Sequence, residues 1–340
     1  MLLCALPGCL VLATAAPGSG SVAPAARPAT IKTFAAPRAP LPADKINLVA
    51  FEHSPFPWRG LIPGTHQPFL YRQNGKFRTH TNENGGYYWE DPTFSDRRSL
   101  LYIPKGFDIE RPILIVVYFH GHRAELLRDV RDRQQVARQL AASGLNAALL
   151  APQFALDAFD SSAGRFWEKD GFAKYLDEAA GHLAALHGGQ NARARFAAAP
   201  VVLVAYSGGY HPAAFAAEIG GVDDRLRGMI LLDAPYGEED MLVSWLARRH
   251  AETFFVSAHG MAPREYNAKL MRLLDDRGAN LHRSLPASLT PGTIVFFDAG
   301  DKPVHEDFVT RAWVDDPLRH LLSLIPGFAR TGYRPQNTKP

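Results

Sequence analysis

From residue 113 onward, the sequence alternates short runs of apolar, often β-branched residues with longer stretches in which apolar residues recur at helical spacing. A continuous apolar run is typical of a strand buried on both faces, and the helical spacing is typical of an amphipathic helix. Strands that alternate with helices pair in parallel through right-handed crossovers. We therefore predict an α/β fold. The expected strands are 113–119, 146–152, 201–205, 229–233, 253–258 and 293–298, and the expected helices are 124–143, 172–186, 210–218, 239–250, 264–276 and 306–324.

The part of the chain before residue 113 is more mixed. Further strands are expected at residues 70–72 and 99–104, and the Asn-Glu-Asn-Gly-Gly cluster at 82–86 is typical of a turn. No internal repeat and no second domain boundary is visible after residue 45. We therefore expect residues 45–340 to form a single domain.

Ser207 lies where a buried strand is expected to give way to a helix, in the segment Ala205-Tyr206-Ser207-Gly208-Gly209. A serine on such a turn is a nucleophile elbow, and the turn needs small residues on both sides because the strand and the helix crowd the serine backbone. Ala205 and Gly209 supply them, although glycine is more usual than alanine at the first position. The alternative is a serine that merely caps the following helix.

Three further segments occur in the order that a serine nucleophile would need. The strand at 113–119 ends in His120-Gly121-His122-Arg123, the strand at 229–233 ends in Asp233, and the strand at 293–298 is followed by a loop that holds His305. Over roughly residues 95–325, the chain resembles the α/β-hydrolase superfamily, in which the nucleophile, the acid and the base follow in this order. The resemblance implies an α/β-hydrolase fold with a mostly parallel central sheet and helices on both faces. It also implies a serine hydrolase that cleaves an ester, or an amide or thioester, through an acyl-enzyme.

This resemblance assigns a role to each candidate residue. Ser207 is the expected nucleophile, and His305 is the expected base because an imidazole suits proton transfer near neutral pH. Asp233 is the expected acid, with Glu265 as the alternative, since some superfamily members take the acid from after the next strand. The oxyanion hole is expected from the backbone amides of Gly208 and His122.

The long loop 153–171 leaves a strand at the edge where ligands bind in parallel sheets, and such loops often shape substrate pockets. We expect Arg165, Phe166 and Trp167 from this loop to contact the substrate, together with Tyr210 just after the elbow. Those aromatic residues could equally pin the loop to the body of the protein. The His120 side chain is expected to pack under its loop and to hydrogen-bond the backbone.

Other functions remain open at this point. An acyltransferase would use the same three residues with an alcohol or amine in place of water. A metal-dependent hydrolase would draw its ligands from His120, His122, His211, His259 and Glu125. A non-catalytic binding module on a hydrolase fold is a further alternative.

The net charge of +3 and the lack of any Lys/Arg block argue against a nucleic-acid partner. We expect a small-molecule ester or amide as the partner, with no cofactor, no metal and no stable membrane span.

The N-terminal region favours export. Residues 2–16 are uncharged and apolar, with a small-residue cleavage motif at 13–15, as in a secretory signal peptide, although no Lys or Arg precedes the apolar run. We take residues 1–16 as the signal and residues 17–44, rich in Ala, Pro and Gly, as a disordered linker. The protein is therefore expected to be secreted or periplasmic. Both cysteines, Cys4 and Cys9, fall inside the signal, so the mature protein would contain none.

Overall fold

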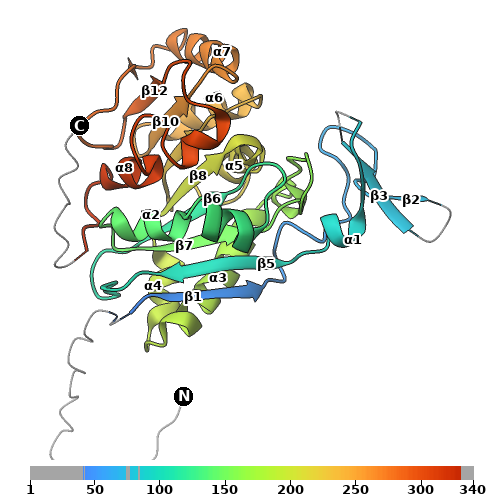
Figure 1. Cartoon of the computed structure of the whole chain (residues 1–340), viewed down its shortest axis with the longest axis horizontal. Coiled ribbons are helices and arrows are strands. Elements are labelled where there is room, and N and C mark those ends of the chain that lie inside the picture. The colour runs from blue at the N-terminus through green and yellow to red at the C-terminus, as the bar shows by residue number, and fades with distance from the viewer. Residues whose placement is uncertain (1–40, 42, 74–76, 83–84, 331–340) are drawn as a thin grey trace, which may run out of the picture. The chain divides into compact units, whose positions relative to one another are not determined.

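The main sheet has nine strands in the order β1-β5-β7-β6-β8-β9-β10-β12-β11 (Figure 1). The computed structural model describes residues 41, 43–73, 77–82 and 85–330, so the expected signal peptide and most of the expected linker lie outside the described residues. The strands are β1 (Lys45–Ala50), β5 (Arg98–Ile103), β6 (Leu114–Phe119), β7 (Ala147–Pro152), β8 (Val201–Tyr206), β9 (Leu226–Leu232), β10 (Phe254–His259), β11 (Leu281–His282) and β12 (Ile294–Asp298). Six neighbouring pairs are parallel, and only β1–β5 and β5–β7 are antiparallel. The predicted mostly parallel sheet is confirmed.

The apolar runs became strands because both faces of the sheet are covered. In β6, Ile115, Val117 and Phe119 belong to one buried cluster, and Leu114, Val116 and Tyr118 belong to another. The first cluster also contains side chains of helices within residues 171–275, and the second contains side chains of helices within residues 126–142 and 317–323. Because successive side chains point to opposite faces of a strand, a strand packed on both sides is apolar throughout.

Most of the expected helices are present with similar bounds. The helices of the first face are α3 (Gly171–His187), α4 (Ala192–Ala198), α5 (Tyr210–Glu218), α6 (Glu239–Arg249) and α7 (Arg264–Asp275), of which only α4 was not predicted. Among the helices of the described residues, none combines the length and the apolar character that a membrane crossing requires.

Two long helices predicted from the sequence are wrong, because each is interrupted. The segment 124–143 forms the π-helix η1 (Leu126–Arg133) and then α2 (Val136–Ala142), separated at Gln135, whose φ of 52° is left-handed. The segment 306–324 forms the short 3₁₀ helix η4 (His305–Val309) and α8 (Pro317–Ser323). Pro317 cannot donate a backbone hydrogen bond, so it starts a new helix rather than continuing one.

A small antiparallel sheet lies in the N-terminal part of the chain. It comprises β2 (Tyr71–Gln73), β3 (Phe77–Thr81) and β4 (Tyr87–Trp89), followed by the short helix α1 (Glu90–Thr93). Only β2 and β5 correspond to strands expected in this region. The Tyr88 hydroxyl accepts a hydrogen bond from the backbone N–H of Phe159 (3.1 Å), and His80 Nε2 lies 3.4 Å from Asp160 Oδ2. The small sheet therefore braces the long loop 153–171.

Candidate active site

Ser207 follows β8 directly and begins a single 3₁₀ turn, η3 (Ser207–Gly209), that leads into α5. Its φ of 53° lies in the left-handed region, which costs a non-glycine residue about 1–3 kcal/mol. The turn is tight enough to demand glycine on two sides. A Cβ at Gly209 would overlap the backbone carbonyl of Phe119, and one at Gly121 would lie 2.8 Å from the Ser207 Cβ. This is the strained strand-to-helix turn that the sequence predicts.

Gly209→Ala is expected to destabilise the fold by about 3 kcal/mol, because the clash is with backbone atoms of β6 that cannot rotate away. Gly181→Ala in α3 is the matched control, since the nearest atom to its Cβ would be 4.0 Å away. The control should be neutral or stabilising by about 0.5–1 kcal/mol, as expected for alanine in a helix. Urea unfolding of the two variants measures the difference, and equal midpoints would contradict the crowding described for this turn.

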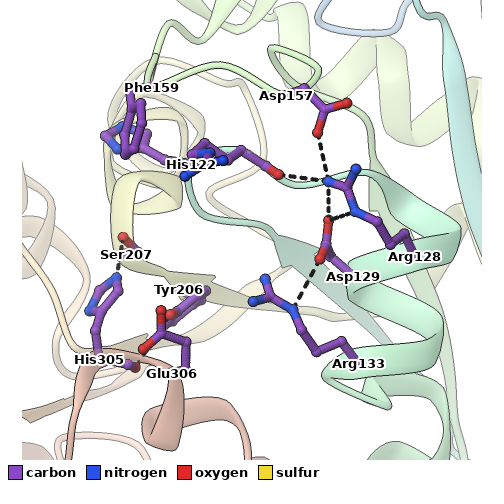
Figure 2. A pocket seen from close by; sticks show the side chains of 11 residues that line it. His122, Arg128, Asp129, Arg133, Asp157, Phe159, Tyr206, Ser207, His305 and Glu306 are labelled. Atoms are coloured by element: carbon purple, nitrogen blue, oxygen red, sulfur yellow. Dashed lines mark hydrogen bonds and ion pairs between the residues drawn. The ribbon is translucent and has the colours of Figure 1, made fainter.

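His305 bridges Ser207 and Asp233. Its Nε2 lies 2.7 Å from Ser207 Oγ, and its Nδ1 lies 2.5 Å from Asp233 Oδ2 (Figure 2 shows the Ser207 contact). Asp233 follows the end of β9, and its side chain is only 4% exposed. Its other carboxylate oxygen, Oδ1, accepts the backbone N–H of Gly260 at 2.9 Å. A carboxylate, an imidazole and a hydroxyl are thus joined in one hydrogen-bonded chain.

Two tyrosines that the sequence analysis did not single out surround the His305 imidazole. The Tyr206 ring stacks on it with centroids 4.9 Å apart, and the Tyr236 ring packs against it edge-on at 6.5 Å. Burial raises the pKa of both hydroxyls well above the usual range, and for Tyr236 the nearby Asp233 carboxylate raises it further. Both tyrosines therefore stay neutral at physiological pH and add no second anion beside the imidazole.

The alternative acid Glu265 lies elsewhere, as do two carboxylates that are close to His305 in the sequence. Glu265 is exposed on α7, and Asp298 and Asp301 form ion pairs with Arg264 at 3.1 and 2.5 Å. Asp233 is therefore the carboxylate that the structure brings to His305.

The two residues expected to form the oxyanion hole lie beside Ser207. Gly208 is in the first turn before α5, where backbone N–H groups have no acceptor within the helix. Within the described part of the chain, the His122 N–H donates to no acceptor. The His122 imidazole lies over Gly208 and contacts Ser161, with Nε2 2.6 Å from Ser161 Oγ. Burial lowers the pKa of His122, so this ring is neutral at neutral pH.

His120 is a structural residue, as its sequence context suggested. Its Nε2 accepts the backbone N–H of Phe154 at 2.9 Å and the amide of Gln153 at 3.0 Å, so the proton resides on Nδ1, which donates to the Gly121 carbonyl at 2.8 Å. Burial lowers the pKa of His120 to about 4. The neutral imidazole thus connects the end of β6 and Gly121 with the long loop 153–171.

The stability of the fold is expected to fall on acidification because of His120. The unfolded chain takes up this proton near pH 6.5, and the folded chain takes it up only near pH 4. The stabilisation is thus complete above about pH 6.5 and decreases by about 3 kcal/mol as the pH falls to about 4. His120→Gln should flatten the pH dependence of unfolding in this window, whereas His66→Gln, at an exposed position, should not. Parallel curves for the His120→Gln variant and the wild type would exclude this origin.

A cavity of about 500 Å³ opens beside Ser207 (Figure 2). Its volume suits a small molecule, and its position at the carboxyl ends of β6 and β8 is where parallel sheets bind ligands. It is lined by His122, Arg123, Arg128, Asp129, Arg133, Asp157, Phe159, Tyr206, Ser207, His305 and Glu306.

The four residues expected to bind substrate do not line this cavity. Phe166 is completely buried and packs on Phe119 and Phe172, so its assignment as a pocket residue is wrong. Arg165 is used within the fold, since its guanidinium donates to the carbonyls of Ser54 (3.3 Å) and Pro57 (3.2 Å).

Trp167 and Tyr210 also contact other side chains instead. The Trp167 indole N–H donates to His211 Nε2 at 2.9 Å, and the Tyr210 ring packs on Tyr236. The loop 153–171 instead contributes Phe159 to the cavity lining, and the loop after β6 contributes Arg123. A pattern of aromatic residues in a loop does not reveal which of them face inward.

The histidines considered as metal ligands are dispersed. His211 Nδ1 lies 2.9 Å from Glu238, and His259 Nδ1 faces the Gly260 carbonyl at 3.2 Å. Across residues 43–73, 77–82 and 85–330, no three His, Cys, Asp or Glu side chains are arranged to hold a metal ion.

Comparisons with known proteins give structural likenesses at low sequence identity. No protein-family model and no curated protein matches the sequence. Among solved structures, the chain is similar to the feruloyl esterase module from Clostridium thermocellum complexed with sinapinate, at 13% identity and a TM-score of 0.45, covering 88% of this chain and 100% of that one. It is also similar to an S-formylglutathione hydrolase from Agrobacterium tumefaciens, at 14% identity and a TM-score of 0.40, covering 75% of this chain and 98% of that one. By the order and direction of its own strands and the elbow that follows β8, the chain has the α/β-hydrolase fold.

Proposed function

We propose that this protein is a serine hydrolase that cleaves a small-molecule carboxylic ester through an acyl-enzyme. One observation carries the proposal: Asp233, His305 and Ser207 are joined by contacts of 2.5 and 2.7 Å at the mouth of a cavity. A serine hydroxyl is a weak nucleophile at neutral pH and needs a positioned base to take its proton. The proposed roles are nucleophile for Ser207, base for His305 and orienting acid for Asp233.

In the acylation step, Ser207 Oγ attacks the ester carbonyl carbon while its proton passes to His305 Nε2. Asp233 accepts the hydrogen bond from Nδ1–H, which holds Nε2 free to take the proton and stabilises the imidazolium that forms. The oxyanion is stabilised by the backbone N–H groups of Gly208 and His122, each of which contributes about 2.7–4 kcal/mol in such sites. The imidazolium then protonates the leaving alkoxide oxygen, and the alcohol departs.

In the deacylation step, water takes the place of the alcohol. His305 Nε2 removes a proton from the water as its oxygen attacks the acyl carbon, and the same proton returns to Ser207 Oγ when the carboxylic acid is released. Asp233 stays in place throughout because Gly260 holds its second oxygen.

Active-site labelling with a fluorophosphonate tests the proposal. The wild-type protein should be modified at one residue, which peptide mass mapping should identify as Ser207, and Ser207→Ala should remain unlabelled. Labelling and ester turnover should both persist after treatment with a chelator. Full labelling of Ser207→Ala, or activity lost with the chelator in a protein that is never labelled, would contradict the proposal.

We also propose that the protein is exported. The support is the uncharged apolar segment at residues 2–16, followed by small residues at 13–15. N-terminal sequencing of the protein recovered from cells should begin shortly after residue 15, and a chain that retains Met1 would contradict export by this route.

A further inference from the structure

The cavity beside Ser207 is lined by three arginines, of which two are neutralised by their neighbours. Arg128 pairs with Asp129 and Asp157, each at 2.6 Å, and Arg133 pairs with Asp129 at 3.0 Å (Figure 2). Because these guanidiniums already have carboxylate partners, they form a structural network along one wall of the cavity.

Arg123 differs from the other two. It is exposed, and in the described part of the chain no carboxylate lies within ion-pair distance of it. Its guanidinium carbon lies 5.1 Å from the centroid of the Phe159 ring, a cation–π arrangement that orients the planar group. The cavity thus contains an oriented cation to which none of the described residues supplies a carboxylate partner.

The backbone at Arg123 is held by hydrogen bonds, so its side chain starts from a defined position beside the cavity. Its φ of 57° is left-handed, its N–H donates to the Ala158 carbonyl at 2.8 Å, and its carbonyl accepts from Arg128 Nη2 at 2.8 Å. Arg123 also directly follows His122, whose amide is the proposed oxyanion donor. The Arg123 side chain therefore starts from the same turn that supplies the proposed oxyanion donor.

Phe159 supplies an apolar surface next to this cation. The residue is 54% exposed, although its backbone is anchored by the Tyr88 hydroxyl and by a hydrogen bond from Asn82 to its carbonyl. A large aromatic ring held toward solvent at the rim of a cavity is suited to contact a ligand.

Glu306 places a negative charge at the end of the cavity opposite Phe159. Figure 2 shows Phe159 and His122 on one side of Ser207 and Glu306 on the other, next to His305. The Glu306 side chain forms no ion pair with the described residues. A negatively charged group is thus attracted to the Arg123 side and repelled from the Glu306 side.

We propose that the substrate is an ester that carries a second, free carboxylate, and that Arg123 binds this carboxylate while Phe159 contacts the adjoining chain. The guanidinium fork matches a carboxylate in a bidentate geometry. A carboxylate balances the single charge of Arg123, whereas a phosphate monoester, with about −1.5 to −2 charges, would bring excess negative charge near Glu306. This inference rests on the proposed function, and it makes Arg123 the residue that determines specificity.

The test compares two 4-nitrophenyl esters that differ in one charge, namely the hydrogen adipate and the methyl adipate. The wild type should prefer the anionic ester, and Arg123→Gln should lower kcat/KM for that ester by about tenfold to a hundredfold, as expected when a charge-assisted hydrogen bond is lost. The variant's kcat/KM for the neutral ester should fall much less, because an equal loss for both esters would indicate damage to the reaction centre and not the loss of a carboxylate contact. Arg131→Gln is the matched control, since Arg131 is exposed, pairs with Asp132 and does not line the cavity.

Three different failures are distinguishable. If the neutral ester is hydrolysed in a Ser207-dependent manner but Arg123→Gln leaves the preference between the two esters unchanged, the carboxylate inference is overturned and the hydrolase proposal stands. If neither ester is hydrolysed and the fluorophosphonate does not label Ser207, the proposed function fails and the inference fails with it. A phosphate-bearing ester cleaved faster than the adipate in an Arg123-dependent manner would overturn the choice of carboxylate.

Discussion

Ser207→Ala is expected to lower kcat by about 10⁶-fold, which is the effect of removing the nucleophile from a working triad. The substitution deletes one hydroxyl and leaves the backbone turn in place, so substrate binding should be retained and the loss should appear in kcat rather than in KM. Burst kinetics with a 4-nitrophenyl ester test this role directly, because an initial burst of nitrophenolate appears only when an acyl-enzyme forms faster than it is hydrolysed.

Ser284→Ala, at an exposed position, is the control for this experiment and should behave as the wild type. A Ser207→Ala variant that keeps more than about a hundredth of the activity would assign the nucleophile to another residue or to an activated water.

Asp233→Asn should lower kcat by about 10⁴-fold without a comparable change in stability. The amide has nearly the same shape, but it cannot hold the Nδ1–H tautomer of His305 as a carboxylate does, and it carries no charge to stabilise the imidazolium. The matched controls are Glu265→Gln and Asp298→Asn, which lie away from His305 and should retain activity within about twofold. Measurement of kcat for the three variants on one ester is sufficient.

A loss below tenfold for Asp233→Asn would be inconsistent with an orienting role and would reopen the assignment of the acid. A large loss for Glu265→Gln would point to a rearrangement of α7 on substrate binding.

The central strands of the fold were predictable because their burial is two-sided. A strand such as β8, which is buried at all six positions, leaves a continuous apolar run that is hard to mistake. β1 was missed because it is an edge strand with mixed exposure, and its sequence Lys45-Ile46-Asn47-Leu48 lacks such a run. The break at Gln135 was missed because the apolar spacing continues through it, and a left-handed φ at a glutamine has no local sequence signature.

The proximity of Ser207 and His305 could be anticipated from chain order, because the carboxyl ends of parallel strands meet at one edge of the sheet. The choice between Asp233 and Glu265 could not be made from chain order, because both residues follow strands that end at this edge. The substrate-side residues were least predictable. Arg165 and Arg123 look alike in the sequence, yet Arg165 donates to backbone carbonyls and Arg123 lines the cavity. This difference depends on contacts between loops that are distant in the sequence.

The small sheet supports Phe159 but does not position the reacting residues. Substitutions in the small sheet therefore differ in their effect from substitutions in the large sheet. Strands β3 and β4 touch the loop that shapes one wall of the cavity, whereas Ser207, Asp233 and His305 are positioned by the large sheet. Replacements in β3 and β4 would remodel that wall while the reacting atoms keep their places. Substrate selectivity can thus change while the catalytic residues keep their arrangement. These strands are where directed evolution toward new esters would best begin.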